Sequence, residues 1–269
     1  MKRTIILTLL LCMAVTASAQ FGRSGPERQP FGRGAYRRGE FGGGWSPLNH
    51  ANCSLYLDAR YSAADNAWVS LSPNLAVTFA QANGALQPVL TQDVQNGLPG
   101  MLFTTANAEY MSAGDVNGIY SNTNGLTIFL VVKPAGAAGS RTFISKYSVT
   151  NLRQWFVGTS EVRIQELLTA TNDGADLTPS ASAQIISGVW TPGSAAKSYV
   201  NGSLAATATV AVTDIPTGTA NLLLGALYLP TLNWYYRGYL FTIVAYSRAL
   251  GDAERLQVEL GLNNIWRIY

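Results

Sequence analysis

The pair Asn201-Gly202 is the strongest local constraint on how this chain can fold. It lies between Ser198-Tyr199-Val200 and Ser203-Leu204, two runs with the composition of short strands. Both central residues of a type I′ turn need a positive φ, and Asn and Gly tolerate that conformation best. The sequence therefore predicts a β-hairpin over residues 197–210.

Beyond residue 45 the chain continues as short strand-like runs separated by Gly, Asn and Pro. The run over residues 126–132 is apolar at nearly every position and is stopped by Pro134, which is typical of a central strand buried on both faces. A second long strand is predicted over residues 239–246, and residues 171–176 indicate a turn. This spacing favours an all-β sandwich over a parallel α/β sheet.

Residues 252–266 are the one segment that shows helical periodicity. Glu254 falls near the first turn, where a carboxylate suits the positive end of a helix. Leu256 and Leu260 share one apolar stripe, and a neighbouring stripe holds Val258, Leu262 and Ile265. We expect the two stripes together to dock this helix onto the sandwich.

The first nineteen residues are typical of a secretory signal peptide. Lys2 and Arg3 precede an apolar run, and Ala17-Ser18-Ala19 supplies the small residues of a cleavage site. The run is shorter than the roughly 20 residues that span a bilayer, and no later segment is a membrane helix. We expect a mature chain that begins at Gln20 and is secreted, periplasmic or bound at the cell surface.

Residues 20–45 are rich in Gly and Arg and repeat with a period of ten. Phe21, Phe31 and Phe41 fall at the same phase, and little between them could build a core. We interpret the stretch as a disordered tether to a single domain over residues 46–269. An alternative is an adhesive arm whose arginines contact an anionic surface.

The net charge of +3 does not describe the folded part of the chain. The signal carries two positive charges, and residues 20–45 carry five Arg against two Glu. The remaining 11 basic and 13 acidic residues give −2. A nearly neutral domain has no electrostatic surface for nucleic acid.

Cys53 is the single cysteine that remains after the signal is removed. It has no partner for an intramolecular disulfide, so the core alone must stabilise the fold. We expect its thiol to be buried as a small hydrophobic group.

Several motifs of the second half occur in a characteristic order. A strand ending at Trp190 precedes the Tyr-Val-Asn-Gly-Ser-Leu hairpin, and Leu222-Leu223-Leu224-Gly225-Ala226 follows. The series ends with Tyr236-Arg237-Gly238 and Tyr246-Ser247-Arg248-Ala249-Leu250. Weaker marks are Leu57-Asp58-Ala59, Asn96-Gly97-Leu98-Pro99 and residues 127–132.

With these motifs, residues 53–266 resemble the laminin G-like, concanavalin A-like lectin and glucanase superfamily. The resemblance implies a two-sheet antiparallel jelly-roll β-sandwich with a short C-terminal helix. It also implies a recognition or accessory role, since members bind glycans, other proteins or calcium. Fold alone is a poor guide to function, so the ligand stays open.

Catalytic chemistry has few candidate residues. His50 is the only histidine in the sequence. A Ser-His-Asp triad that uses any other histidine is therefore excluded, and so is a histidine-rich zinc site. Glucanases of this fold carry their carboxylates at alternate strand positions, whereas Glu161 and Glu166 lie five residues apart and would face opposite sides of a regular strand. We predict no catalytic residues, with a polysaccharide lyase or glycoside hydrolase as an alternative.

Calcium is the cofactor that the resemblance implies most readily, and it needs several oxygen ligands. Asn172, Asp173 and Asp176 form the densest group of such ligands. A simple Gly-containing turn between two strands explains the same residues equally well.

Aromatic side chains are the candidates for glycan contact, because an exposed ring can stack on a sugar. Trp234 and Tyr235 precede the aromatic-Arg-Gly turn and lie near Tyr228. Trp155, close to Arg153, is a second candidate. The alternative for all of them is packing in the core or at its rim.

The sequence thus predicts a secreted, non-catalytic module that recognises a glycan or a cell-surface component, such as a surface protein. A structural subunit of an extracellular or surface assembly is the competing interpretation. A polysaccharide-degrading enzyme is the third.

Overall fold

The computed structural model describes residues 45–104, 107–121, 123–136, 141–147, 153–166, 171–178, 180–210, 213, 219–229 and 231–269. Within these ranges, residues 153–154, 161, 163–166, 171–174 and 229 are described by their backbone alone. No helix in this part of the chain is both long and apolar enough to cross a membrane.

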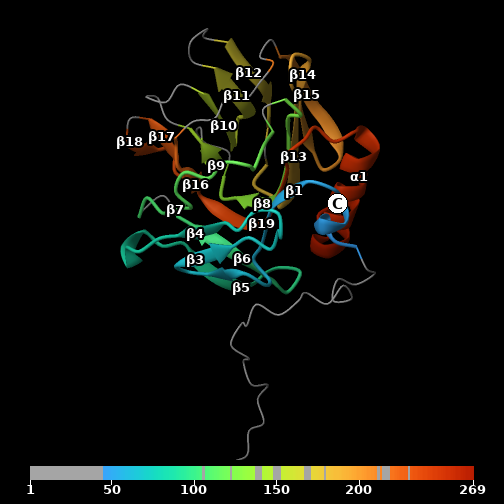
Figure 1. Ribbon diagram of the computed structural model, residues 1–269. Coiled ribbons are helices and arrows are strands. Elements are labelled where there is room, and N and C mark those ends of the chain that lie inside the picture. The colour runs from blue at the N-terminus through green and yellow to red at the C-terminus, as the bar shows by residue number, and fades with distance from the viewer. Residues whose placement is uncertain are drawn as a thin grey trace, which may run out of the picture. The chain divides into compact units, whose positions relative to one another are not determined.

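Two antiparallel sheets and one long helix build the described domain (Figure 1). Sheet A has the strand order β15 (Ser203–Thr209), β14 (Ala195–Val200), β13 (Gln184–Thr191), β8 (Leu126–Pro134), β19 (Gly238–Tyr246), β6 (Leu98–Phe103) and β5 (Val89–Gln95), and β1 (Cys53–Asp58) also pairs with β19. Sheet B has the order β12 (Thr171–Asp176), β11 (Glu161–Glu166), β10 (Arg153–Gly158), β9 (Thr142–Lys146), β16 (Leu222–Leu224), β7 (Met111–Ser112), β4 (Thr78–Ala80), β3 (Ala67–Val69) and β2 (Ala63–Ala64).

Smaller elements complete the fold. A two-stranded hairpin is formed by β17 (Leu227–Leu229) and β18 (Thr231–Asn233). Short 3-10 turns lie at Pro47–Asn49 and Gly84–Leu86, and the helix is α1 (Asp252–Trp266). This arrangement confirms the predicted two-sheet antiparallel sandwich with its C-terminal helix.

The central strands β8 and β19 have both faces buried. In β8, Ile128 and Leu130 face the core between the two sheets, whereas Phe129 and Val131 face a second core beneath α1. Because both faces of the strand meet apolar partners, the nearly continuous apolar run of its sequence is satisfied. The prediction of a strand buried on both faces is confirmed.

The predicted hairpin is also confirmed. Strands β14 and β15 meet at Asn201 and Gly202, which have φ of 49° and 81°. Both lie in the left-handed region that the type I′ turn requires. The thiol of Cys53 is buried as well, and burial raises its pKa to about 12.

Helix α1 covers the outer face of sheet A with one side only. Val258, Leu262 and Trp266 are buried against the sheet, whereas Leu256 and Leu260 are exposed. The expectation that both apolar stripes dock onto the sandwich is therefore wrong for the stripe of Leu256 and Leu260, which faces solvent. Residues two positions apart in a helix differ by about 200° around its axis, so the stripe of Leu256 and Leu260 faces away when Val258 packs.

The predicted turn over residues 171–176 is likewise wrong, because these residues form strand β12. Its register with β11 is continuous from Glu161 opposite Asp176 to Glu166 opposite Thr171. In a regular ladder of this kind, the backbone N–H and C=O groups form hydrogen bonds with the neighbouring strand. In a turn, the side chains of the turn itself would have to supply some of those bonds. The connection between the two strands, residues 167–170, lies outside the described residues.

Candidate functional site

The outer face of sheet B carries the hairpin β17–β18, which the chain reaches directly after β16. The change of direction occurs at Gly225, whose φ is 78° and whose missing side chain makes room for the ring of Phe103. The Ser145 hydroxyl of β9 donates to the Ala226 carbonyl at 2.8 Å, and the Tyr236 N–H donates to the Gly225 carbonyl at 2.8 Å. The first bond attaches the start of the hairpin to β9, and the second joins the two ends of the hairpin to each other.

Three aromatic rings pack edge to face beneath this hairpin. The Tyr147 and Phe156 ring centroids are 6.0 Å apart at 90°, and those of Phe156 and Trp234 are 5.9 Å apart at 74°. Leu227 of β17 is buried in the same cluster, whereas Trp234 is only half-buried. Edge-to-face packing of this kind fixes the orientation of each ring. One side of the Trp234 indole is therefore supported by the protein, and part of it reaches solvent.

The backbone of Trp234 is held in an unusual conformation. Its φ is 51°, in the left-handed region that a bulky residue rarely adopts. The Asn233 side-chain oxygen accepts from the Trp234 N–H at 2.8 Å, and the Trp234 carbonyl accepts from the Thr142 N–H at 2.9 Å. These two bonds stabilise a conformation that otherwise costs on the order of 1–3 kcal/mol.

Tyr235 adds a partly buried phenol next to Trp234. The Arg141 guanidinium donates to the Tyr235 carbonyl at 3.1 Å. Burial raises the pKa of Tyr235, and the nearby phenol of Tyr110 raises it further, so the Tyr235 hydroxyl is neutral at physiological pH. The next residue, Tyr236, is fully buried against Phe143 at 4.8 Å between ring centroids and serves as packing.

Tyr228 is exposed over 39% of its surface but lies on the other face of the hairpin. In the ladder it stands opposite Leu232, whereas its neighbour Leu227 stands opposite Asn233. Because successive residues of a strand alternate between faces, Tyr228 points away from the aromatic cluster that contains Leu227. The Trp234 ring thus packs on Phe156, the Tyr235 phenol lies near Tyr110, and Tyr228 points to the opposite side of the hairpin.

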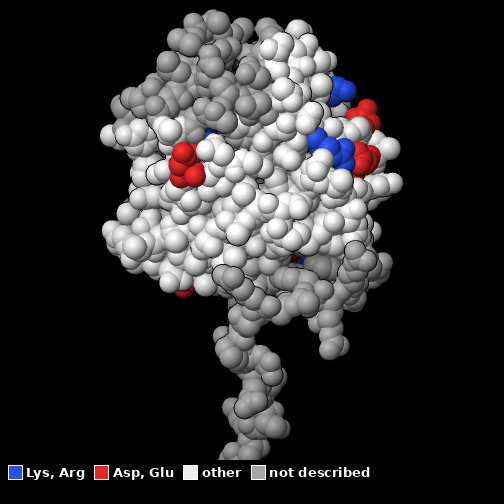
Figure 2. Space-filling model, viewed as in Figure 1, with Lys and Arg blue, Asp and Glu red and all other residues white. Residues whose placement is uncertain are grey.

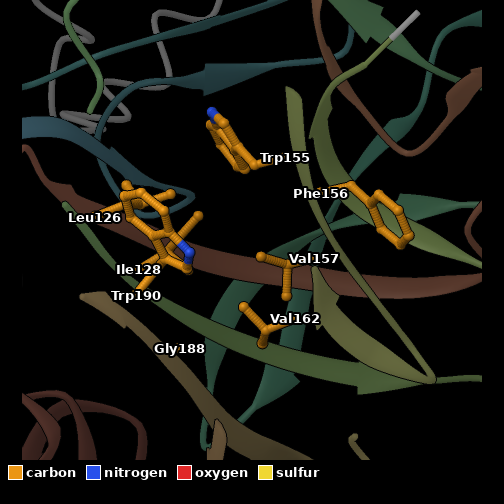
Figure 3. Close-up of a pocket in the computed structure, with 8 residues that line it drawn as sticks. All are labelled: Leu126, Ile128, Trp155, Phe156, Val157, Val162, Gly188 and Trp190. Atoms are coloured by element: carbon orange, nitrogen blue, oxygen red, sulfur yellow. The ribbon is translucent and has the colours of Figure 1, made fainter. Parts of the chain in front are cut away.

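The second predicted pair does not form a surface site. Trp155 is 1% exposed and faces the core between the sheets, where it lines a cavity of about 10 Å³ with Trp190, Gly188 and Val162 (Figure 3). The side chain of Arg153 lies outside the described residues. Within the described part of the chain, the indole N–H groups of Trp155 and Trp190 have no hydrogen-bond partner. A space of this size has room for about one water molecule.

Phe156, rather than its neighbour Trp155, lies on the outer face of sheet B, where we had expected Trp155. Adjacent strand residues face opposite sides, so one member of the Trp155-Phe156 pair had to lie on the outer face of sheet B. That alternation was the available signal for Phe156. Nothing in the sequence marked Tyr147 as its partner, because the contact joins β10 to the residue after β9.

The predicted calcium ligands lie along β12 rather than in a loop. Asp176 is exposed, and the side chains of Asn172 and Asp173 lie outside the described residues. Calcium binding by these three residues stays a prediction. Among the described residues, no group of three or more His, Cys, Asp or Glu side chains could hold a metal ion.

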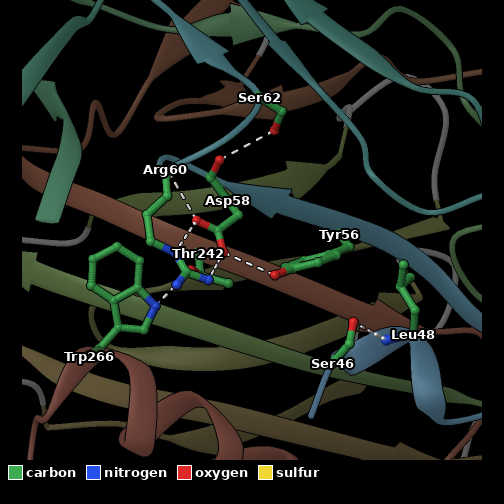
Figure 4. A network of polar contacts seen from close by, with 8 residues as sticks. All are labelled: Ser46, Leu48, Tyr56, Asp58, Arg60, Ser62, Thr242 and Trp266. Carbon is green, nitrogen blue, oxygen red and sulfur yellow. Dashed lines mark hydrogen bonds and ion pairs between the residues drawn. The ribbon is translucent and has the colours of Figure 1, made fainter. Parts of the chain in front are cut away.

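A dense polar network lies at the opposite side of the molecule, near the end of α1 (Figure 4). The Asp58 carboxylate accepts from the Arg60 guanidinium at 2.7 and 2.9 Å and from the Tyr56 hydroxyl at 3.0 Å. The Trp266 indole donates to the Thr242 hydroxyl at 2.9 Å, with the Arg60 guanidinium 5.5 Å from its ring. These partners occupy both oxygens of Asp58, and we assign the network a structural role.

Together, the two antiparallel sheets and the aromatic hairpin that covers part of the outer face of sheet B define a lectin-like jelly-roll sandwich. Residues 105–254, more than half of the chain, match the model of the concanavalin A-like lectin/glucanases superfamily described as laminin G type 3. The chain belongs to this superfamily. No curated protein matches its sequence.

Solved structures show the same fold at low sequence identity. The binding domain of Paraclostridial Mosquitocidal Protein 1 has a TM-score of 0.60 and 12% identity over 81% of this chain and 54% of its own. Domain 4 of AbnA, a GH43 extracellular arabinanase from Geobacillus stearothermophilus in complex with arabinotriose, has a TM-score of 0.52 and 12% identity over 77% of this chain and 98% of its own. Trypanosoma rangeli sialidase in complex with the inhibitor DANA has a TM-score of 0.53 and 14% identity over 79% of this chain and 33% of its own.

These coverages mean that the chain spans about half of the toxin domain and a third of the sialidase. At such identities the likeness extends to the fold alone.

Proposed function

We propose that this protein is a secreted, non-catalytic binding module that recognises a glycan through the Trp234 side of the hairpin β17–β18. The observation that carries the proposal is the half-buried indole of Trp234, which is held in place by its neighbours. Its backbone is fixed by two hydrogen bonds, and its ring is supported edge-on by Phe156. A pre-positioned ring lowers the entropic cost of binding, because little side-chain freedom remains to be lost.

The surroundings of Trp234 support an uncharged or weakly polar ligand surface. Tyr235 offers a neutral hydroxyl group, which both donates and accepts hydrogen bonds, as sugar hydroxyls require. Asn233 is exposed beside the ring and adds an amide. Aromatic faces combined with a few polar groups are typical of small-molecule and sugar sites.

The proposed location of the protein depends on the N-terminal segment. Residues 1–19 have the composition of a secretory signal, and residues 20–45 would serve as a tether between the domain and its surroundings. Secretion supports a glycan ligand, since extracellular proteins meet polysaccharides and glycosylated surfaces.

Isothermal titration with oligosaccharides tests the proposal. An array of plant, bacterial and animal glycans would select the ligand class, with arabino-oligosaccharides included because a structural neighbour was solved with arabinotriose. We expect Trp234→Ala to weaken binding of the selected glycan by at least about tenfold, equal to about 1.4 kcal/mol, since aromatic anchors dominate binding energies. Val89→Ala, which removes an exposed apolar side chain from sheet A, should bind like the wild type.

Two results would overturn the proposal. Absence of any specific glycan on the array would remove its ligand, and an unchanged affinity of Trp234→Ala would remove its site. Release of reducing ends or unsaturated products from any polysaccharide would contradict the non-catalytic part. Repeating the titration in EDTA addresses calcium, which stays a prediction.

A further inference from the structure

Helix α1 has two apolar sides, and sheet A uses only one of them. The outward side presents Leu256, exposed over 41% of its surface, and Leu260, exposed over 53%. The two residues are four positions apart and therefore adjacent on the helix surface. Leucines of this exposure on a solvent-facing helix form an apolar surface that the isolated domain leaves uncovered.

The exposed stripe around these leucines carries no charge. It consists of Ala253, Leu256, Gln257, Leu260 and Asn264, all classed as exposed. Exposed charged groups of the described helix stand at the ends of the stripe or beside its first turn, where the Glu254 side chain is 41% exposed and paired with Arg248. The Asp252 side chain at the start of the helix is 70% exposed, and Arg267 is exposed just beyond the last turn.

This distribution is self-complementary under a two-fold rotation. The midpoint between Leu256 and Leu260 falls at position 258, one residue from the midpoint of Asp252–Trp266. If a second α1 lies antiparallel on the first, Leu256 of one copy meets Leu260 of the other. The Asp252 end of each helix then faces the Arg267 end of the partner helix. The two helix dipoles are antiparallel, which is a favourable arrangement.

Two further apolar side chains border the same surface. Leu204 is 57% exposed and stands opposite Tyr199 in the β14–β15 ladder. The Arg255 guanidinium of α1 lies 3.6 Å from the Tyr199 ring centroid, so Leu204 shares the helix side of sheet A. Tyr269, 52% exposed, is attached to α1 through its N–H and carbonyl, which both bond to Asn263.

We propose that the exposed side of α1 is the two-fold interface of a homodimer, with the two helices packed antiparallel. The central contact is made by Leu256 and Leu260 of both copies, bordered by Leu204 and Tyr269. Asp252 of each copy lies toward Arg267 of the other. A contact centred on two leucines from each copy belongs at the small end of specific interfaces, below about 1,200 Å² in total, so we expect a weak dimer that forms only at high protein concentration.

Sedimentation velocity of the full chain, purified after export with its own signal, tests the dimer between about 1 µM and 1 mM. The wild type should pass from monomer to dimer in this range. The double substitution Leu256→Glu and Leu260→Glu should raise the dissociation constant more than tenfold, because it places four carboxylates at the centre of the contact. Val69→Glu with Val89→Glu is the matched control, since it adds the same charge at exposed valines of β3 and β5.

A charge exchange tests the antiparallel orientation. Arg267→Asp should weaken the dimer about fivefold or more, and adding Asp252→Arg should restore most of the affinity. Circular dichroism and thermal unfolding of each variant verify that the fold is kept, which matters because Asp252 also accepts from the Tyr199 hydroxyl at 3.3 Å. A wild type that stays monomeric throughout, or a leucine variant that dimerises as the wild type does, overturns the proposal. Failure of the second substitution to restore affinity overturns the antiparallel arrangement.

Discussion

At the scale of single residues, Trp234 shows how a costly conformation can indicate a role. Its left-handed φ is stabilised by groups from two places, the side chain of Asn233 and the backbone of Thr142. A smaller or more flexible residue would satisfy the same loop at lower cost. A large ring at this costly position is consistent with a contact that the isolated domain does not make.

Glu254 is the residue whose protonation we expect to affect stability most directly. The Arg248 guanidinium donates to its two oxygens at 2.7 and 2.8 Å, and this bonding lowers the pKa of Glu254 below its ordinary value of 4.5. The unfolded chain binds the proton at higher pH than the folded one. The pair therefore stabilises the fold above the unfolded pKa, and this contribution is lost as pH falls through the folded pKa.

Glu254→Gln should consequently lower the melting temperature at pH 7, and this difference should shrink as the pH falls below 4.5 and through the lower folded pKa. The pair is partly exposed, so the loss at pH 7 should stay under about 1 kcal/mol, or roughly 2–4 °C. Differential scanning calorimetry of both proteins between pH 3 and pH 7 measures it. An equal difference at every pH would show that the ion pair is not its source.

At the scale of elements, the two sheets pack closely where Gly188 of β13 meets Val162 of β11. A Cβ placed on Gly188 would lie 2.5 Å from a methyl carbon of Val162. The strands can approach only because position 188 lacks a side chain. The same contact borders the cavity that Trp155 and Trp190 share.

Gly188→Ala should destabilise the protein by roughly 1–3 kcal/mol, because the added methyl group overpacks the contact with Val162. Adding Val162→Ala should restore part of the loss by making room. Urea unfolding of the single and double variants measures both effects. Gly84→Ala, where a Cβ meets nothing within 4 Å, is the control and should change stability little. A destabilisation that Val162→Ala does not reduce would contradict this account.

At the scale of the whole molecule, three layers depend on two separate cores. One core lies between the sheets, and the other joins α1, the N-terminal part of the domain and the outer face of sheet A. Trp266 anchors the second core, with its ring centroid 5.1 Å from that of Phe241. Figure 2 shows that charged side chains are sparse over most of the visible described surface, as expected for a domain stabilised by apolar burial.

Trp266→Ala should lower the free energy of unfolding by about 3–5 kcal/mol, because it empties a fully buried site and leaves the Thr242 hydroxyl without its donor. Trp234→Ala should cost much less, since its ring is only half-buried. Chemical denaturation followed by circular dichroism compares the two. If the Trp234 variant were equally destabilised, its loss of glycan binding could no longer be attributed to the site.

The sequence by itself determined the strand-rich fold, the Asn201-Gly202 hairpin, the doubly buried strand at residues 126–134 and the position of the C-terminal helix. These features follow from local chemistry: the φ preferences of two residues, a continuous apolar run and a periodicity of 3.6. Such patterns define the faces of an element, and they do not state which face another element will cover.

Only the tertiary structure decided those choices. It placed Trp155 in the core and Phe156 under the hairpin, and it separated Tyr228 from Trp234. It paired residues 171–176 with β11 and turned Leu256 and Leu260 toward solvent. Each of these outcomes depends on contacts between segments distant in the chain, and packing of the whole domain selects them.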